Sequence, residues 1–139
     1  MEKLQVEVII KFTGTNFGAY VPLLPGCVAT ASEPGEIMDN IREAIQAHVE
    51  SSLADNDPLD EAFKGAYELQ FQFDTVGLLN YFKGIFTNAA LEKLTGIHQK
   101  QIQHYASGLK RPRKQQAQKI EHALHKLGRN LLEIDVVTN

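Results

Sequence analysis

Residues 4–12 carry apolar side chains at every second position, with mostly polar residues between them. This period of two is typical of a strand that buries one face. Two more extended runs follow, over residues 17–23 and 27–31, and a glycine-containing turn at 13–16 separates the first two runs. The pattern predicts a hairpin and then a third strand.

A helical spacing of apolar residues follows over residues 34–53. Its predicted inward face consists of Ile37, Ile41, Ala44, Ile45, His48 and Val49. Pro34 fits the first turn, because the N–H that proline lacks would be unpaired there. Residues 68–74 alternate again and predict another strand. The β-β-β-α-β order predicts an α+β fold, with a small antiparallel sheet and one packed helix.

The segment 87–112 predicts two short helices joined by a tight turn. The first covers 87–94, with Thr87 or Asn88 as N-cap and with Ala90, Leu91 and Leu94 facing inwards. Gly96 suits the left-handed residue that ends a helix, and Ile97 is expected to fill the corner. The second helix covers 98–107, buries Ile102 with Tyr105 or Ala106, and stops at Gly108.

The outward side of that second helix carries Gln99, Lys100, Gln103 and His104. Glutamine pairs with adenine through two hydrogen bonds, and lysine reaches guanine acceptors or phosphate. The basic run 109–114 follows at once and suits phosphate. The spacing therefore favours a helix that enters the major groove, although a solvated helix of any small bundle has the same pattern.

Further helices are predicted on both sides of this pair, over residues 76–86 and 113–126. The last helix turns Ile120, Ala123, Leu124 and Leu127 inwards. The apolar segment 131–137 is too rich in Leu, Ile and Val for a free tail. It is interpreted as packing on the helical domain or as part of a dimer contact.

The two halves of the chain differ in charge. Residues 1–74 contain four basic and thirteen acidic residues, whereas residues 75–139 contain ten basic and four acidic residues. An acidic half joined to a basic half indicates two domains with different partners, at 1–74 and 75–139. The basic half suits a polyanion, and the acidic half suits a basic protein.

The sequence of 139 residues lacks features that several classes of protein require. The single cysteine, Cys27, allows neither an internal disulfide nor a thiolate metal cluster. His122 and His125 lie three residues apart, but no further ligand completes a metal set, so neither metal nor cofactor is expected. Without a signal peptide or an apolar run of roughly 20 residues, we expect a cytoplasmic protein with no membrane partner.

The basic half resembles the helix-turn-helix of the phage-repressor (XRE/Cro) class over residues 76–128. The residues that carry this resemblance are Leu91, the Thr95-Gly96-Ile97 turn, Ile102, Ser107-Gly108, Pro112, Ile120, Ala123 and Leu124. The sequence departs from that class at His98, because a small hydroxyl residue usually caps the recognition helix there. The resemblance implies an all-α domain that binds double-stranded operator DNA.

Nine residues form the predicted DNA-binding set. Base-edge contacts are assigned to Gln99, Lys100, Gln103 and His104, phosphate contacts to Thr87, Lys110, Arg111 and Arg113, and His98 is included at the helix cap. Because operators are two-fold symmetric, the chain is expected to form a homodimer or a higher homo-oligomer.

The acidic half resembles HicB-type antitoxins over residues 4–74, chiefly through the run AYVPLLPGCVAT at 19–30. It departs from that pattern at Leu23, where an acid is common, and at Ala31, where glycine is usual. The resemblance implies a partial ribonuclease-H-like fold. It also implies an antitoxin of a type II system that sterically blocks a small basic HicA-type toxin, an mRNA-degrading ribonuclease, and represses its own operon.

Two alternatives stay open at this stage. One is a stand-alone transcriptional regulator whose first domain senses a ligand or only dimerises. The other is a degenerate nuclease, which requires several carboxylates converging from strands on metal ions. The strand acids Glu2, Glu7 and Asp74 are expected on the solvent side, so no catalytic residue is assigned and no enzyme is expected.

Overall fold

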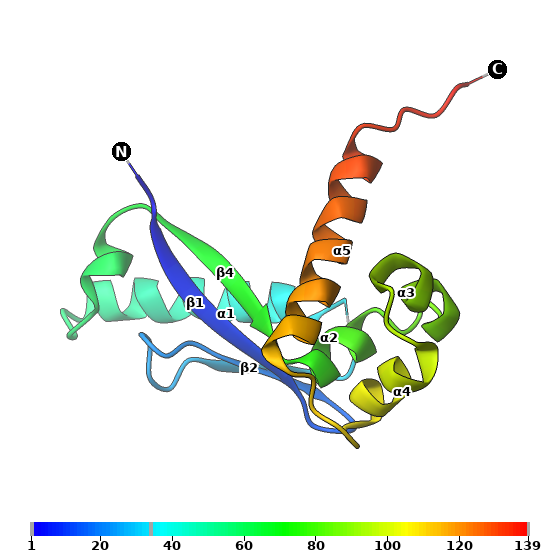
Figure 1. Ribbon diagram of the computed structural model, residues 1–139. Coiled ribbons are helices and arrows are strands. Elements are labelled where there is room, and N and C mark those ends of the chain that lie inside the picture. The colour runs from blue at the N-terminus through cyan, green and yellow to red at the C-terminus, as the bar shows by residue number, and fades with distance from the viewer. Residues whose placement is uncertain (1, 34, 139) are drawn as a thin grey trace. The chain divides into compact units, whose positions relative to one another are not determined.

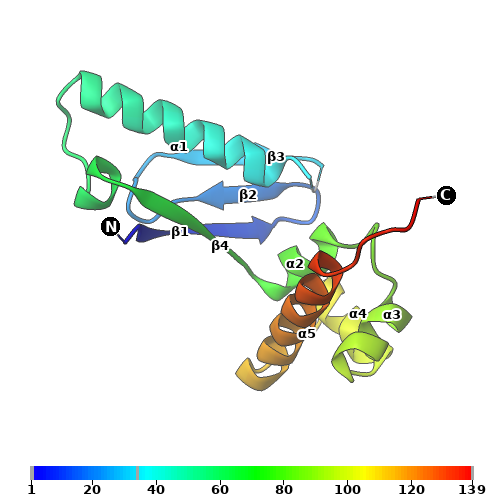
Figure 2. The same cartoon turned by 90° about the horizontal axis from the view of Figure 1, so that it is seen from above.

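The computed structural model describes residues 2–33 and 35–138. Its chain divides into two compact units between Phe82 and Lys83, and Figures 1 and 2 show the elements of each unit. In the described part of the chain, no helix combines the length and the apolar character that crossing a membrane requires.

The first unit contains a four-stranded mixed sheet and one long helix. Its elements are β1 (Leu4–Phe12), β2 (Phe17–Tyr20), β3 (Val28–Ala31), α1 (Ile37–Ala54), the 3-10 turn η1 (Glu61–Lys64), β4 (Tyr67–Phe73) and α2 (Thr75–Tyr81). The predicted α+β class and the β-β-β-α-β order are confirmed.

The direction of the last strand differs from the prediction. The sheet order is β3-β2-β1-β4, with β1 antiparallel to β2 but parallel to β4. The expectation of a purely antiparallel sheet is therefore wrong. The physical reason is the long connection through α1, which takes the chain from the β3 edge to the opposite edge. Such a crossover lets the next strand enter in the same direction as β1.

The core of this unit lies between β1 and α1. Val6, Val8 and Ile10 of β1 have no exposed surface, as their alternation predicted. The helix contributes Ile37, Ile41, Ile45 and Val49. Figure 2 shows α1 lying along the strands, with the sheet on one side of it. The apolar face of β1, which repeats every two residues, and that of α1, which repeats every 3.6, therefore pack together in one layer.

The helix begins later than expected. α1 starts at Ile37, after a turn in which the Glu36 N–H donates a hydrogen bond to the Glu33 carbonyl oxygen at 3.2 Å. Pro34, predicted for the first helical turn, lies outside the described residues. The helix ends at Ala54, one residue beyond its predicted end.

The segment between β2 and β3 folds as two successive turns, so the predicted strand 17–23 is too long. β2 ends at Tyr20. The Leu24 N–H donates to the Val21 carbonyl and the Cys27 N–H donates to the Leu24 carbonyl, both at 3.0 Å. These turns bury every third residue, namely Val21, Leu24 and Cys27. Burial also raises the pKa of the Cys27 thiol, which disfavours the thiolate and supports a packing role.

α2 packs on the first unit. The Tyr81 ring lies 5.2 Å from the Phe73 ring, and the Tyr81 hydroxyl donates to Met38 Sδ at 3.6 Å. The helix predicted over 76–86 as part of the second domain instead ends at Tyr81. Aromatic contacts with the sheet therefore attach this segment to the N-terminal unit.

Gly77 lies where α2 meets β1. A Cβ atom there would lie 2.7 Å from Asp74 Oδ1 and 3.4 Å from the Phe12 nitrogen. The same Asp74 oxygen accepts a hydrogen bond from the Gly77 N–H at 2.7 Å, so it cannot move away without uncapping the helix. We expect Gly77→Ala to lower the free energy of unfolding of the first unit by about 1–3 kcal/mol.

Chemical denaturation followed by circular dichroism measures this loss. Gly65→Ala is the matched control, because a Cβ at Gly65 meets no atom within 4 Å. If both variants unfold at the same denaturant concentration, the close approach at Gly77 contributes nothing to stability.

The second unit consists of three helices, α3 (Asn88–Thr95), α4 (Gln99–Ser107) and α5 (Lys114–Leu132). The helices predicted over 87–94 and 98–107 are confirmed to within one residue at each end. The buried residues of this unit are Leu91, Ile97, Ile102, Tyr105 and Ile120. Leu94, predicted to face inwards, is 36% exposed.

The C-terminal end differs more from the prediction. α5 runs to Leu132, beyond its expected end at 126. The apolar residues Leu131, Leu132, Ile134, Val136 and Val137 are between 56% and 88% exposed. Their predicted packing on the helical domain is therefore wrong, whereas a contact with a second copy stays a prediction.

Candidate nucleic-acid interface

Local chemistry fixes the ends of α3 and α4. Thr87 Oγ1 accepts a hydrogen bond from the Ala90 N–H at 3.0 Å and caps α3. Gly96 and Gly108 follow the two helices with φ angles of 77° and 80°. Glycine adopts this left-handed conformation without a Cβ penalty. These caps were predicted from the sequence and are confirmed.

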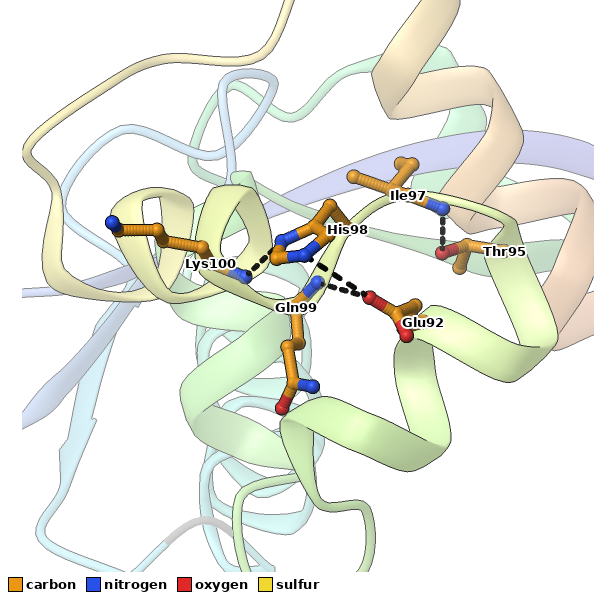
Figure 3. A network of polar contacts seen from close by, with 6 residues as sticks. All are labelled: Glu92, Thr95, Ile97, His98, Gln99 and Lys100. Atoms are coloured by element: carbon orange, nitrogen blue, oxygen red, sulfur yellow. Dashed lines mark hydrogen bonds and ion pairs between the residues drawn. The ribbon is translucent and has the colours of Figure 1, made fainter.

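The turn between the helices is tied by one hydroxyl group. Thr95 Oγ1 donates to the Leu91 carbonyl oxygen at 2.7 Å and accepts from the Ile97 N–H at 3.1 Å. Ile97 is 4% exposed and fills the corner, as predicted. Figure 3 shows this turn leading into the start of α4.

His98 caps α4 in place of the usual hydroxyl residue. Its carbonyl oxygen accepts from the N–H groups of Gln101 and Ile102 at 2.9 and 3.1 Å. Its Nδ1 atom accepts from the Lys100 N–H at 3.1 Å. Because Nδ1 is an acceptor, the proton of the neutral ring lies on Nε2. The departure at position 98 therefore preserves the capping function.

Glu92 supplies a second cap for α4 from the preceding helix. Its Oε1 atom accepts from the Gln99 N–H at 2.9 Å and lies 4.0 Å from His98 Nε2 (Figure 3). Glu92 was not among the residues predicted from the sequence. Its partner lies seven positions away across a turn, and no local pattern signals such a contact.

The predicted base-edge residues fall into two groups. Gln99, Lys100 and Gln103 are exposed and share one side of α4. His104, predicted to face outwards, is half-buried. Its Nδ1 atom is buried and finds no hydrogen-bond partner among the described residues. The structure therefore brings three of the four side chains together on an accessible surface.

The basic segment begins at the C-terminal end of α4. The Lys110 N–H donates to the His104 carbonyl oxygen at 3.2 Å. Lys110, Arg111 and Arg113 are exposed. Within the described ranges, no carboxylate lies within 4.0 Å of their charged groups. These cations are available to an anionic partner, and Thr87 is exposed although its hydroxyl serves as a cap.

The surface of the first unit is acidic. All of its described carboxylates are exposed, and that of Asp74 also caps α2. Among the residues that the structure describes, cations pair with two of them, in Asp39–Arg42 at 3.1 Å and Glu61–Lys64 at 3.3 Å. The other carboxylates contribute an unneutralised negative field.

Neither unit gathers ligands of the kind that hold a metal ion. Groups of three or more His, Cys, Asp or Glu side chains with such geometry are absent from residues 2–33 and 35–138. His122 and His125 are exposed on α5. Glu2, Glu7 and Asp74 are exposed, as predicted from the sequence.

Comparison with known proteins gives one family. The family described as "HicB_like antitoxin of bacterial toxin-antitoxin system" matches residues 6–74. The match covers all but the first two residues of the sheet, together with α1 and the turns at 21–27, and it ends where α2 begins. No curated protein and no solved structure matches the chain.

Proposed function

From the match of residues 6–74 to the HicB-like antitoxin family, we propose that the chain is an antitoxin that also represses its own operon. The family match carries the first part of the proposal. The exposed polar face of α4 and the unpaired basic segment after it support the second part. No catalytic residue is assigned, and inhibition is by occlusion.

The partner proposed for the first unit is a small basic HicA-type toxin that degrades mRNA. Ribonucleases of this kind need a positive surface to hold their substrate. An acidic domain attracts such a surface and excludes the RNA from it. The carboxylates that lack a cationic neighbour in the first unit support this mechanism, because their negative charge is available to a basic partner.

The first test uses the full chain in its native cells. A tagged copy is purified, and the proteins that co-elute with it in stoichiometric amounts are identified by mass spectrometry. We expect a small basic protein that degrades RNA when freed and stops when the chain is added back. A chain that retains specific DNA binding without such a partner would instead be a plain transcriptional regulator.

The ligand proposed for the second unit is double-stranded operator DNA, with α4 as the recognition helix of a helix-turn-helix. Gln99, Lys100 and Gln103 read base edges, while Lys110, Arg111 and Arg113 contact phosphate. His98, His104 and Thr87 complete the proposed contact set. Two copies bind a two-fold operator together, so the working form is a homodimer or a higher oligomer.

Replacing a base-reading residue and replacing a phosphate-binding residue should change DNA binding in different ways. We expect Lys100→Ala or Gln103→Ala to weaken binding to the preferred DNA by roughly 1–3 kcal/mol and to relax its sequence preference. Arg111→Ala should weaken all DNA alike and reduce the slope of log affinity against log salt by about one. Competitive binding to a randomised duplex library measures both effects.

The control for this comparison is Lys119→Ala, which removes the same charge from an exposed position on α5. Sequence preference in the Lys100 and Gln103 variants that equals that of the control would remove α4 from the proposed interface. It would leave the antitoxin part of the proposal untouched.

A further inference from the structure

Two residues hold the first turn of α4 in place, one at the N-terminus of α4 itself and one in α3. The Lys100 N–H is capped by the adjacent His98, whereas the Gln99 N–H is capped by Glu92 of α3 at 2.9 Å. The carboxylate of Glu92 therefore ties the start of α4 to the middle of the preceding helix. A helix begins with N–H groups that lack intrahelical partners. A carboxylate at that end also interacts favourably with the positive end of the helix dipole.

The rest of the turn does not depend on Glu92. Thr95 Oγ1 ties Ile97 to α3, and buried Ile97 fills the corner. The Glu92 side chain is 38% exposed, and loss of its carboxylate leaves the Gln99 N–H open to water. The unit is therefore expected to fold without this contact, while the orientation of the first turn of α4 becomes less defined.

That first turn carries the side chains proposed to read bases. In Figure 3 the Lys100 side chain extends away from α3, while its backbone and that of Gln99 are held by His98 and Glu92. Base-edge hydrogen bonds need fixed direction and distance, whereas phosphate contacts tolerate displacement. A looser first turn therefore affects base reading more than phosphate binding.

From these contacts we infer that Glu92 is a specificity-determining positioning residue. It orients Gln99 and Lys100 through the Gln99 backbone N–H and does not itself contact DNA. The inference rests on the proposed DNA binding of α4. As a carboxylate, Glu92 repels phosphate, so its removal raises affinity for any sequence, and its positioning effect is visible in the ratio of specific to non-specific binding.

The experiment separates the acceptor from the charge. Glu92→Ala removes both, whereas Glu92→Gln removes the charge and keeps an oxygen that can accept from the Gln99 N–H. Glu121→Ala and Glu121→Gln make the same charge changes at an exposed position on α5. Each full-length variant is titrated with the duplex that wild type selects from a randomised library and with a shuffled duplex of the same composition.

The ratio of affinities for the two duplexes should fall roughly tenfold in Glu92→Ala, the loss typical of one base-reading contact. It should stay within about twofold of wild type in Glu92→Gln and in both Glu121 variants, which keep that contact. Amide hydrogen exchange at Gln99 provides a structural readout, and we expect faster exchange in Glu92→Ala with rescue in Glu92→Gln.

Three outcomes overturn the inference. A Glu92→Ala ratio equal to that of Glu121→Ala excludes the positioning role while leaving DNA binding by α4 intact. A Glu92→Gln variant as impaired as Glu92→Ala assigns the effect to charge. A wild-type chain that selects no sequence removes the proposed DNA-reading function, and the positioning role with it.

Discussion

Replacing Ile102 with alanine is expected to unfold the second unit and abolish the proposed DNA binding, while the first unit stays folded. Ile102 is 1% exposed and lies on the inward side of α4. Removing its methyl and methylene groups from a packed core costs about 2–5 kcal/mol. A three-helix unit of this size rarely has more than about 3–5 kcal/mol of stability in all. The expected loss is therefore comparable to the entire free energy of unfolding of this unit.

Hydrogen exchange measured by mass spectrometry resolves the two units in one experiment. Peptides from α3, α4 and α5 should exchange rapidly in Ile102→Ala, while peptides from β1 and α1 keep their protection. Ile85→Ala is the control, because Ile85 is 70% exposed in the same unit. Full protection of α4 in the Ile102 variant would contradict the central packing role given to this residue.

Replacing Phe17 with alanine is expected to have the opposite distribution of effects. Phe17 is 2% exposed, and its ring lies 5.0 Å from that of Phe12 and 6.3 Å from that of Tyr81. Loss of a buried phenylalanine lowers the free energy of unfolding by about 3–5 kcal/mol. Contacts between aromatic rings contribute stability beyond that of the buried apolar area. The first unit should unfold and lose its proposed toxin partner, while α4 keeps its protection.

The matched control is Leu53→Ala, since Leu53 is 53% exposed on α1 of the same unit. The free energy of unfolding of this control should change little. If the Phe17 variant retains both its exchange protection and its toxin partner, the aromatic contacts with Phe12 and Tyr81 are dispensable. Loss of DNA binding in the Phe17 variant would show that the units depend on each other.

Features that depend on near neighbours were predictable. The ends of α3 and α4 were located because Thr87, Gly96 and Gly108 act within one helical turn. The faces of β1 and α1 followed from periods of two and 3.6, since burial of one face is what the pattern records. The exposed trio of Gln99, Lys100 and Gln103 followed from the same reasoning.

Features that depend on distant partners were not predictable. His104 has the helical position of an exposed residue, yet part of its ring is covered by the packed unit. The segment 75–82 has the composition of a leading helix, but the ring of Tyr81 packs against Phe17 and Phe73 of the sheet. Glu92 caps Gln99 across a turn, and only the angle between two helices brings them together.

The sequence by itself determined the order of the strands and helices, the caps at Thr87, Gly96 and Gly108, the apolar faces of β1 and α1, and the division of charge between the two halves, because each is set by local chemistry or simple counting. Tertiary structure alone decided that β4 runs parallel to β1, that the turns at 21–27 enter the core, and that α2 packs on the first unit. Those features depend on which residues, far apart in the sequence, pack together in the interior, and close packing in three dimensions decides this.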